Sequence, residues 1–121
     1  MYKEIALQWA DALESGKYKQ GRGKLRRGDK FCCLGVLCNL HAQAHPEIAA
    51  AQKKPGIYMG EVLGLSKEVA AWAGMDNSGL GEFAFELDNA PNAGSLADLN
   101  DQDRFTFKQI AEVIRVYHKE L

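Results

Sequence analysis

Residues 31–38, FCCLGVLC, form the most apolar run of the chain, and any fold of this sequence has to bury them. The overlapping segment 34–44 is apolar nearly all round at its start, a pattern typical of a buried helix. Pro46 ends this predicted helix, because a proline restricts the backbone of the residue before it. Gly35 inside the helix indicates the close approach of another element. We therefore expect this segment in the core.

The two ends of the chain predict amphipathic helices. Over residues 2–15, apolar side chains recur at every fourth position, namely Ile5, Trp9 and Leu13. Thr106 and Gln109 form a T-x-x-Q capping box in front of a predicted helix over 107–119. The apolar stripe of this last helix comprises Ile110, Val113, Ile114 and Tyr117. This stripe needs a partner, and the first helix is the natural one.

The middle of the chain gives weaker local signals. Ser66 is a suitable N-cap for a short helix over 67–73, which Gly74 would end. Residues 75–94 carry turn-forming residues at close intervals around EFAFEL, so we expect mostly loop with a short strand at EFAFEL. Residues 47–64 predict no particular structure, and whether they fold over the basic segment described next stays open.

A basic, glycine-rich segment precedes the apolar run. Gly28-Asp29 is a dipeptide that closes two-residue hairpins, which predicts a short β-hairpin over about residues 22–33. Alternate side chains of a strand share a face, so we expect Arg22, Lys24 and Arg26 to point together. Leu25 and Arg27 would then take the other side. With 121 residues, we expect one globular domain over 1–121, of the α+β class, compact and mostly helical with a short β-hairpin.

The charges are separated along the chain. The net charge is −1, but residues 17–30 hold seven bases and one acid, a local charge of +6. Residues 76–103 hold seven acids and no base. The overall balance argues against a general nucleic-acid binder. Neither a signal peptide nor a membrane span is evident, so we expect a cytoplasmic protein without a membrane partner.

The cysteines admit three interpretations. Cys32 or Cys33 near a helix start could be a stabilised thiolate, which would suit a small thiol-dependent hydrolase, but the sequence offers no well-placed histidine base. Cys38, His41 and His45 would line one helix face as metal ligands, yet structural zinc usually takes ligands from two separate elements. Reduced, buried core cysteines are the most common case, so we expect neither a catalytic residue nor a metal or other cofactor.

The acidic DLNDQD sequence at 98–103 resembles the start of a calcium loop but departs from it at two key positions. Asp103 replaces the required glycine, and Gln109 replaces the bidentate glutamate. We therefore expect a solvated connection in front of the last helix.

The basic segment is the remaining candidate for a functional site. Arginines bind phosphate oxygens in pairs, and glycines expose backbone N–H groups to a ligand. The alternative is a solvated hairpin that the acidic segment of the same chain neutralises. The predicted ligand-binding residues are Tyr18, Lys19, Arg22, Lys24, Arg26 and Arg27. Tyr18 or Trp9 would supply a stacking surface.

Three segments, LRRGDKFCCLGVLCNL, SKEVAAWAGM and SLADLNDQDRFTFKQIAEVI, resemble a family of small uncharacterised proteins encoded by tailed bacteriophages and prophages. The resemblance covers most of the chain and centres on the CCLGVLC run and the LND…TF..IA ending. It brings no catalytic residues with it. It implies the cytoplasm of a host cell and a role against host defence.

These observations lead to three hypotheses. The first is a non-enzymatic counter-defence protein that sequesters a small phosphorylated, nucleotide-type ligand through the basic segment. The second is an inhibitor that docks on a host protein complex through its opposed charged patches. The third is the thiol-dependent hydrolase. Binding is favoured over catalysis, and a homo-oligomer stays open.

Overall fold

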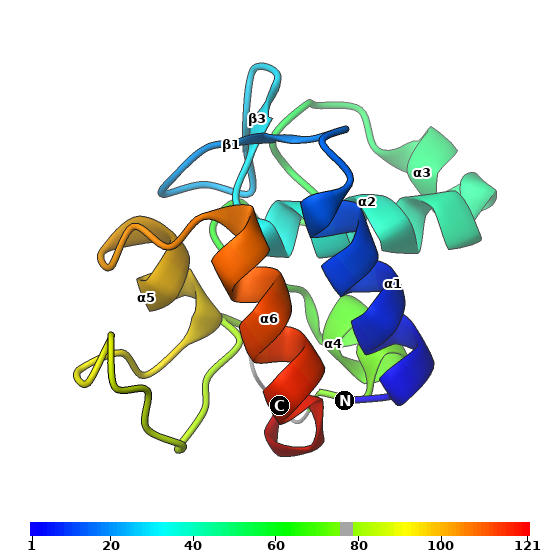
Figure 1. Cartoon of the computed structure of the whole chain (residues 1–121). Coiled ribbons are helices and arrows are strands. Elements are labelled where there is room, and N and C mark those ends of the chain that lie inside the picture. Colours follow the sequence, from blue (N-terminus) through cyan, green and yellow to red (C-terminus); the bar gives the residue numbers. More distant parts are fainter. Residues whose placement is uncertain (76–78) are drawn as a thin grey trace.

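The structure, a computed structural model, describes residues 1–75 and 79–121 and has an α+β fold (Figure 1). The helices are α1 (Lys3–Glu14), α2 (Cys33–Ala44), α3 (Pro46–Ala51), α4 (Lys67–Ala73), α5 (Leu96–Asp101) and α6 (Phe107–Tyr117), followed by a 3-10 turn over His118–Glu120. The strands are β1 (Lys19–Gln20), β2 (Arg26–Arg27) and β3 (Lys30–Phe31). The prediction of a mostly helical α+β protein with a small hairpin is confirmed.

Helix α2 lies in the core, as its apolar sequence predicts. Its residues Cys33, Leu34, Val36 and Leu37 are completely buried. Helices α1 and α6 lie side by side (Figure 1), so the two predicted amphipathic faces do pack on each other. Trp9 of α1 is also completely buried and donates its Nε1 proton to the carbonyl of Cys33 at 2.9 Å. Trp9 therefore belongs to the core, and the expectation that it offers a stacking surface is wrong.

The helix caps follow the sequence closely. The Ser66 side chain accepts a hydrogen bond from the Val69 N–H at 3.2 Å, and Gly74 ends α4 in the left-handed conformation. Thr106 and Gln109 form the predicted capping box of α6. The last helix ends at Tyr117, two residues earlier than expected, where a 3-10 turn replaces it.

The sheet is smaller and differently built than the predicted hairpin. Strands β2 and β3 pair antiparallel around the Gly28-Asp29 turn, as expected, but each has only two residues. Strand β1 adds to the other side of β3 in parallel, which gives the order β1-β3-β2. Arg22 and Lys24 lie in the loop before β2, so the expectation that they share a strand face with Arg26 is wrong.

Two further expectations for the acidic region are wrong. EFAFEL is not a strand and forms only an isolated bridge between Glu82 and Ser95. The 98–103 segment is not a solvated connection, because its first part belongs to α5, where Leu99 and Asn100 are completely buried. The expected loop over 75–94 is confirmed for the described part; Asp76, the first acid of the predicted acidic stretch, lies outside the described residues.

Candidate ligand site

The residues predicted to bind a ligand do not form one site. Across the sheet, Lys19 pairs with Lys30 and Lys30 with Arg27, so these three cations form a row on one face. Arg26 pairs with Phe31, and the two point to the opposite face. The loop residues Arg22 and Lys24 belong to neither set. Of the predicted set, Arg26 is among the described residues that line a cavity.

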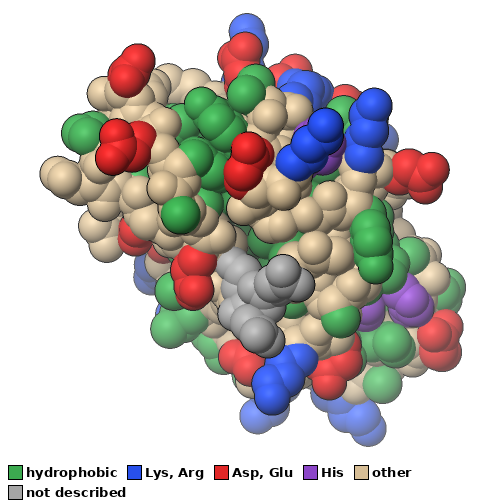
Figure 2. Space-filling model, turned by 90° about the horizontal axis from the view of Figure 1, so that it is seen from below, with side chains coloured by type: hydrophobic (Ala, Val, Ile, Leu, Met, Phe, Trp, Pro, Cys, Tyr) green, Lys and Arg blue, Asp and Glu red, His purple; other side chains and the backbone are tan. Residues whose placement is uncertain are grey.

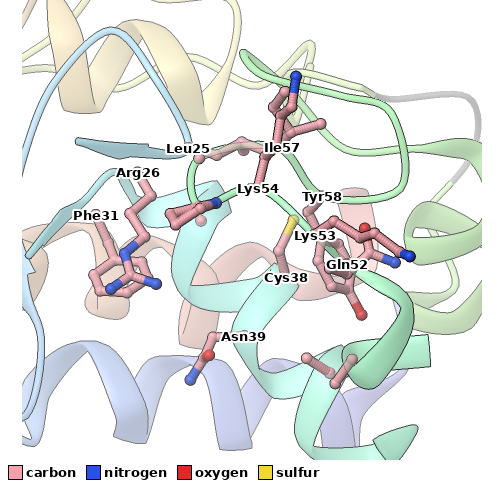
Figure 3. Close-up of a pocket in the computed structure, with 15 residues that line it drawn as sticks. Leu25, Arg26, Phe31, Cys38, Asn39, Gln52, Lys53, Lys54, Ile57 and Tyr58 are labelled. Atoms are coloured by element: carbon pink, nitrogen blue, oxygen red, sulfur yellow. The ribbon is translucent and has the colours of Figure 1, made fainter. Parts of the chain in front are cut away.

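This cavity has a volume of about 390 Å³ and lies between the sheet, α2, α3 and the segment 52–58 (Figure 3). Its size is within the range of about 300–1,000 Å³ that small-molecule sites occupy. One wall is formed by Arg26 and Phe31, and the α2 part of the lining includes Gly35, Cys38 and Asn39. The remaining lining residues come mainly from the segment for which the sequence predicted no structure, namely Ala49, Gln52, Lys53, Lys54, Pro55, Gly56, Ile57 and Tyr58.

The charge of the lining is entirely positive. Arg26, Lys53 and Lys54 contribute three cations, and no acid is found among the described residues that line the cavity. The Arg26 guanidinium lies 5.0 Å from the centre of the Phe31 ring, and its Nε donates to the carbonyl of Gly28 at 2.7 Å. These two contacts hold the side chain in place, and its terminal N–H groups have no hydrogen-bond partner among the residues that the structure describes. A guanidinium at such a wall is suited chemically to the oxygens of an anion.

Residues 52–62 are held against the rest of the site by specific contacts. The Leu25 N–H donates to the carbonyl of Val62 at 2.8 Å, and the Met59 N–H donates to the Gln52 side chain at 2.9 Å. Gly56, with φ of +89°, lies so close to the β2 backbone that a Cβ there would be 3.2 Å from the carbonyl oxygen of Arg26. The segment therefore does fold over the basic hairpin, the point that the sequence left open.

A histidine-tyrosine contact ties this segment to α2. The Tyr58 hydroxyl lies 2.6 Å from His41 Nδ1, and His41 is only 3% exposed. Burial and the neighbouring His45 lower the pKa of His41, so its imidazole is neutral at pH 7. Burial raises the pKa of Tyr58 to about 12, so its hydroxyl keeps its proton. The pair is therefore an uncharged hydrogen bond.

The three thiols are core groups. Burial raises the pKa of Cys32 to about 11 and that of Cys38 to about 12, and it raises the pKa of Cys33 further above the usual range. All three thiols thus stay protonated at neutral pH, and none is the lowered-pKa thiol that a thiol-dependent hydrolase uses as its nucleophile. The interpretation of these cysteines as core residues is confirmed.

The two histidines of α2 that were weighed as metal ligands are engaged in other contacts. The His41 and His45 rings stack with centroids 4.2 Å apart. His45 Nδ1 lies 2.9 Å from the carbonyl oxygen of His41, and His41 Nδ1 contacts Tyr58. Within residues 1–75 and 79–121, no group of three His, Cys, Asp or Glu side chains is arranged to hold a metal ion.

Asn100 of α5 helps to position the elements around the site, although the sequence predicts it in a solvated connection. Its Oδ1 accepts from Gln20 Nε2 at 2.9 Å and from the Cys33 N–H at 3.2 Å. Its Nδ2 donates to the carbonyl of Gly21 at 2.9 Å and to Asp101 at 2.8 Å. One amide thus joins α5 to the end of β1 and to the start of α2. Ser95 and Asp98, an S-x-x-D helix-start pattern, were the signal that could have revealed this helix.

A family model for a domain of unknown function, DUF8296, matches residues 1–118. The chain belongs to this family. No curated protein and no solved structure matches the chain. Membership of the DUF8296 family therefore assigns no activity to this protein, and its function has to be argued from the site.

Acidic residues of this DUF8296 protein lie in two places: Asp29 and Asp101 contact Lys19 and the Gly23 N–H of the basic segment, and others lie on a distant segment. Glu82, Glu86 and Asp88 are exposed on the segment that lies at the lower left in Figure 1, whereas the sheet lies at the top. Figure 2 shows that lower end, where acidic and hydrophobic side chains lie together on the left part of the surface. These three acids therefore lie outside the described lining of the cavity. In the described part of the chain, no helix is long and apolar enough to span a membrane.

Proposed function

We propose that this protein binds and sequesters a small phosphorylated, nucleotide-type ligand in the cavity, without catalysing a reaction on it. The observation that carries the proposal is a cavity lined by three cations and no acid among its described residues, with two aromatic side chains beside them. The resemblance to tailed-phage and prophage proteins implies a role against host defence. In this proposal the protein would remove a host defence signal from the cytoplasm.

The lining suits the two chemical parts of a nucleotide. Arg26 presents a guanidinium whose planar N–H groups match phosphate oxygens, and Lys53 and Lys54 add mobile point charges. Phe31 and Tyr58 supply the apolar, aromatic surface that a base requires. The proposed binding set thus keeps Arg26 of the sequence-predicted residues and replaces Lys19, Arg22, Lys24 and Arg27 by cations of the 52–58 segment.

Binding without catalysis fits the protonation states of the site. Cys38, the thiol that lines the cavity, has a pKa of about 12 and is no nucleophile at neutral pH. The neutral His41 ring is only 3% exposed and is occupied by Tyr58.

A thermal-shift screen with linear and cyclic nucleotides tests this proposal. A ligand at about 100 times its dissociation constant adds about 2.7 kcal/mol of stability, which raises the melting temperature by several degrees. The variant in which Arg26, Lys53 and Lys54 are all changed to Gln should lose this shift. The matched control changes Lys19, Arg27 and Lys30 to Gln, which removes the same charge from the other sheet face. The absence of a shift with every nucleotide, or an equal loss in both variants, would refute the proposal.

A second candidate function rests on the sheet face that carries Lys19, Arg27 and Lys30. Lys19, Lys30 and Arg27 lie side by side and exposed, with Lys19 ion-paired to Asp29 at 2.9 Å. Like charges directly opposite one another in a sheet cost stability. Such a row suits docking on an acidic face of a host protein complex. Co-purification from a host lysate tests this: the wild type should retain a partner that the Lys19, Arg27 and Lys30 charge-removal variant loses. The absence of any partner would rule this function out.

A further inference from the structure

Most uncharged polar side chains of the cavity lining already have hydrogen-bond partners within the protein. Gln52 donates to the carbonyl of Ile48 at 3.0 Å and accepts from the Met59 N–H at 2.9 Å. The Tyr58 hydroxyl is paired with His41. These groups build the wall and are not available to select a ligand.

Asn39 of α2 differs from them. Its Nδ2 donates to the Tyr18 hydroxyl at 2.5 Å, and its Oδ1 has no hydrogen-bond partner among the described residues. Asn39 belongs to the lining of the cavity, and Figure 3 shows its amide nitrogen turned away from the middle of the cavity. Asn39 therefore offers the cavity a fixed, uncharged acceptor.

The orientation of this acceptor is set by a chain of contacts. The Tyr18 ring stands edge-on against Phe31, with centroids 5.2 Å apart and planes at 85°. Arg26 covers the same Phe31 ring. The contacts thus run from the proposed phosphate-binding Arg26 through Phe31 and Tyr18 to Asn39, which places the cation and the acceptor on one wall, separated by an aromatic ring.

The ligand has to complement both ends of this wall. An anionic group would contact the cations, and a hydrogen-bond donor on the body of the ligand would satisfy Asn39 Oδ1. Among nucleotides, an exocyclic amino group is such a donor. We propose, on the basis of the function proposed above, that Asn39 selects nucleotides whose base carries an exocyclic amino group. Tyr18 is then a positioning residue, which explains its place beside the basic segment without direct stacking on the ligand.

Matched nucleotide pairs test this selection. AMP and purine riboside 5′-monophosphate differ only in the amino group. CMP and UMP differ at two adjacent ring positions, because CMP has an amino group beside an unprotonated N3 and UMP has a carbonyl beside an N3–H. We expect the amino-bearing member of at least one pair to bind about tenfold more tightly, the effect of one hydrogen bond. Isothermal titration of the full chain gives both affinities.

Three variants separate selection from folding. Asn39→Leu should weaken the amino-bearing nucleotide to the affinity of its partner and leave the partner unchanged. Tyr18→Phe frees the Asn39 amide and should reduce the discrimination while phosphate binding persists. Gln43→Leu, an exposed change one turn further along α2, is the matched control and should keep both affinities.

The outcomes of these experiments distinguish the role of Asn39 from the proposed binding of a nucleotide in the cavity. Equal affinities within both pairs, or discrimination that survives Asn39→Leu in a variant that melts like the control, would overturn the role of Asn39 alone. Failure of all four nucleotides and of the cyclic nucleotides to bind would overturn the proposed function together with it.

Discussion

Replacing Asn100 by Leu tests whether one buried amide holds the sheet, α2 and α5 together. Leucine has a similar size, so the change removes hydrogen bonds without opening a large cavity. Gln20 keeps a bond to the carbonyl of Phe105, and Asp101 keeps the N–H of Gly23. The Cys33 N–H and the Gly21 carbonyl, both in buried residues, lose their Asn100 partner.

Each buried polar group left unsatisfied costs about 1–3 kcal/mol. The two groups together predict a loss of about 4 kcal/mol in the free energy of unfolding, a large share of the roughly 5–15 kcal/mol that stabilises a typical domain. Urea unfolding followed by tryptophan fluorescence measures it, because Trp9 is completely buried and reports on the core.

Asn92→Leu, at an exposed position of the 79–95 segment, is the matched control and should cost less than about 0.5 kcal/mol. A loss below about 1 kcal/mol for Asn100→Leu would show that the amide network contributes little. The assignment of Asn100 as the residue that positions the site would then be wrong.

Two further substitutions and one labelling experiment probe the core and the elements around the cavity. Gly35→Ala should cost at least about 3 kcal/mol in chemical unfolding, because its Cβ would lie 1.8 Å from the Leu25 carbonyl oxygen; a wild-type midpoint would contradict this close contact. The pKa of His41 is lower in the folded state than its ordinary value of 6.5, so the neutral imidazole favours the folded protein. The contribution of His41 to the free energy of unfolding is therefore present above pH 6.5 and is lost as the pH falls below it. His41→Gln should flatten this acid limb of the stability profile, and an unchanged slope would exclude His41 as its source. The thiols should react with a thiol reagent at pH 7.5 only on unfolding, because burial raises the pKa of each; rapid labelling of the native protein would refute their burial.

Local rules account for the parts of the fold that the sequence predicted well. The caps of α4 and α6 depend on side chains within three or four residues, such as Thr106 and Gln109. The paired faces of α1 and α6 follow from helical periodicity. The burial of α2 follows from composition alone. In each case the information lies within one short stretch of chain.

The errors arose where a residue's partner is distant in the chain. Strand β1 exists because Lys19 and Gln20 pair with Lys30 and Phe31, and no local pattern marks a parallel strand of two residues. Asn100 looked like part of a polar loop, because its hydrogen-bond partners in β1 and α2 are 67 to 80 residues away. Polar groups can be buried only when such partners are present, so their burial cannot be deduced from sequence spacing.

The sequence by itself determined the fold class, the core and the presence of a concentrated basic segment near residue 26. Only the tertiary structure decided which cations share a cavity. It separated Lys19 and Arg27 from Arg26 on opposite faces of the sheet and placed Lys53 and Lys54 in the lining of the same cavity as Arg26. Charge counts add along the chain, but a binding site depends on which side chains share a face and a cavity, and that is set by strand register and long-range packing.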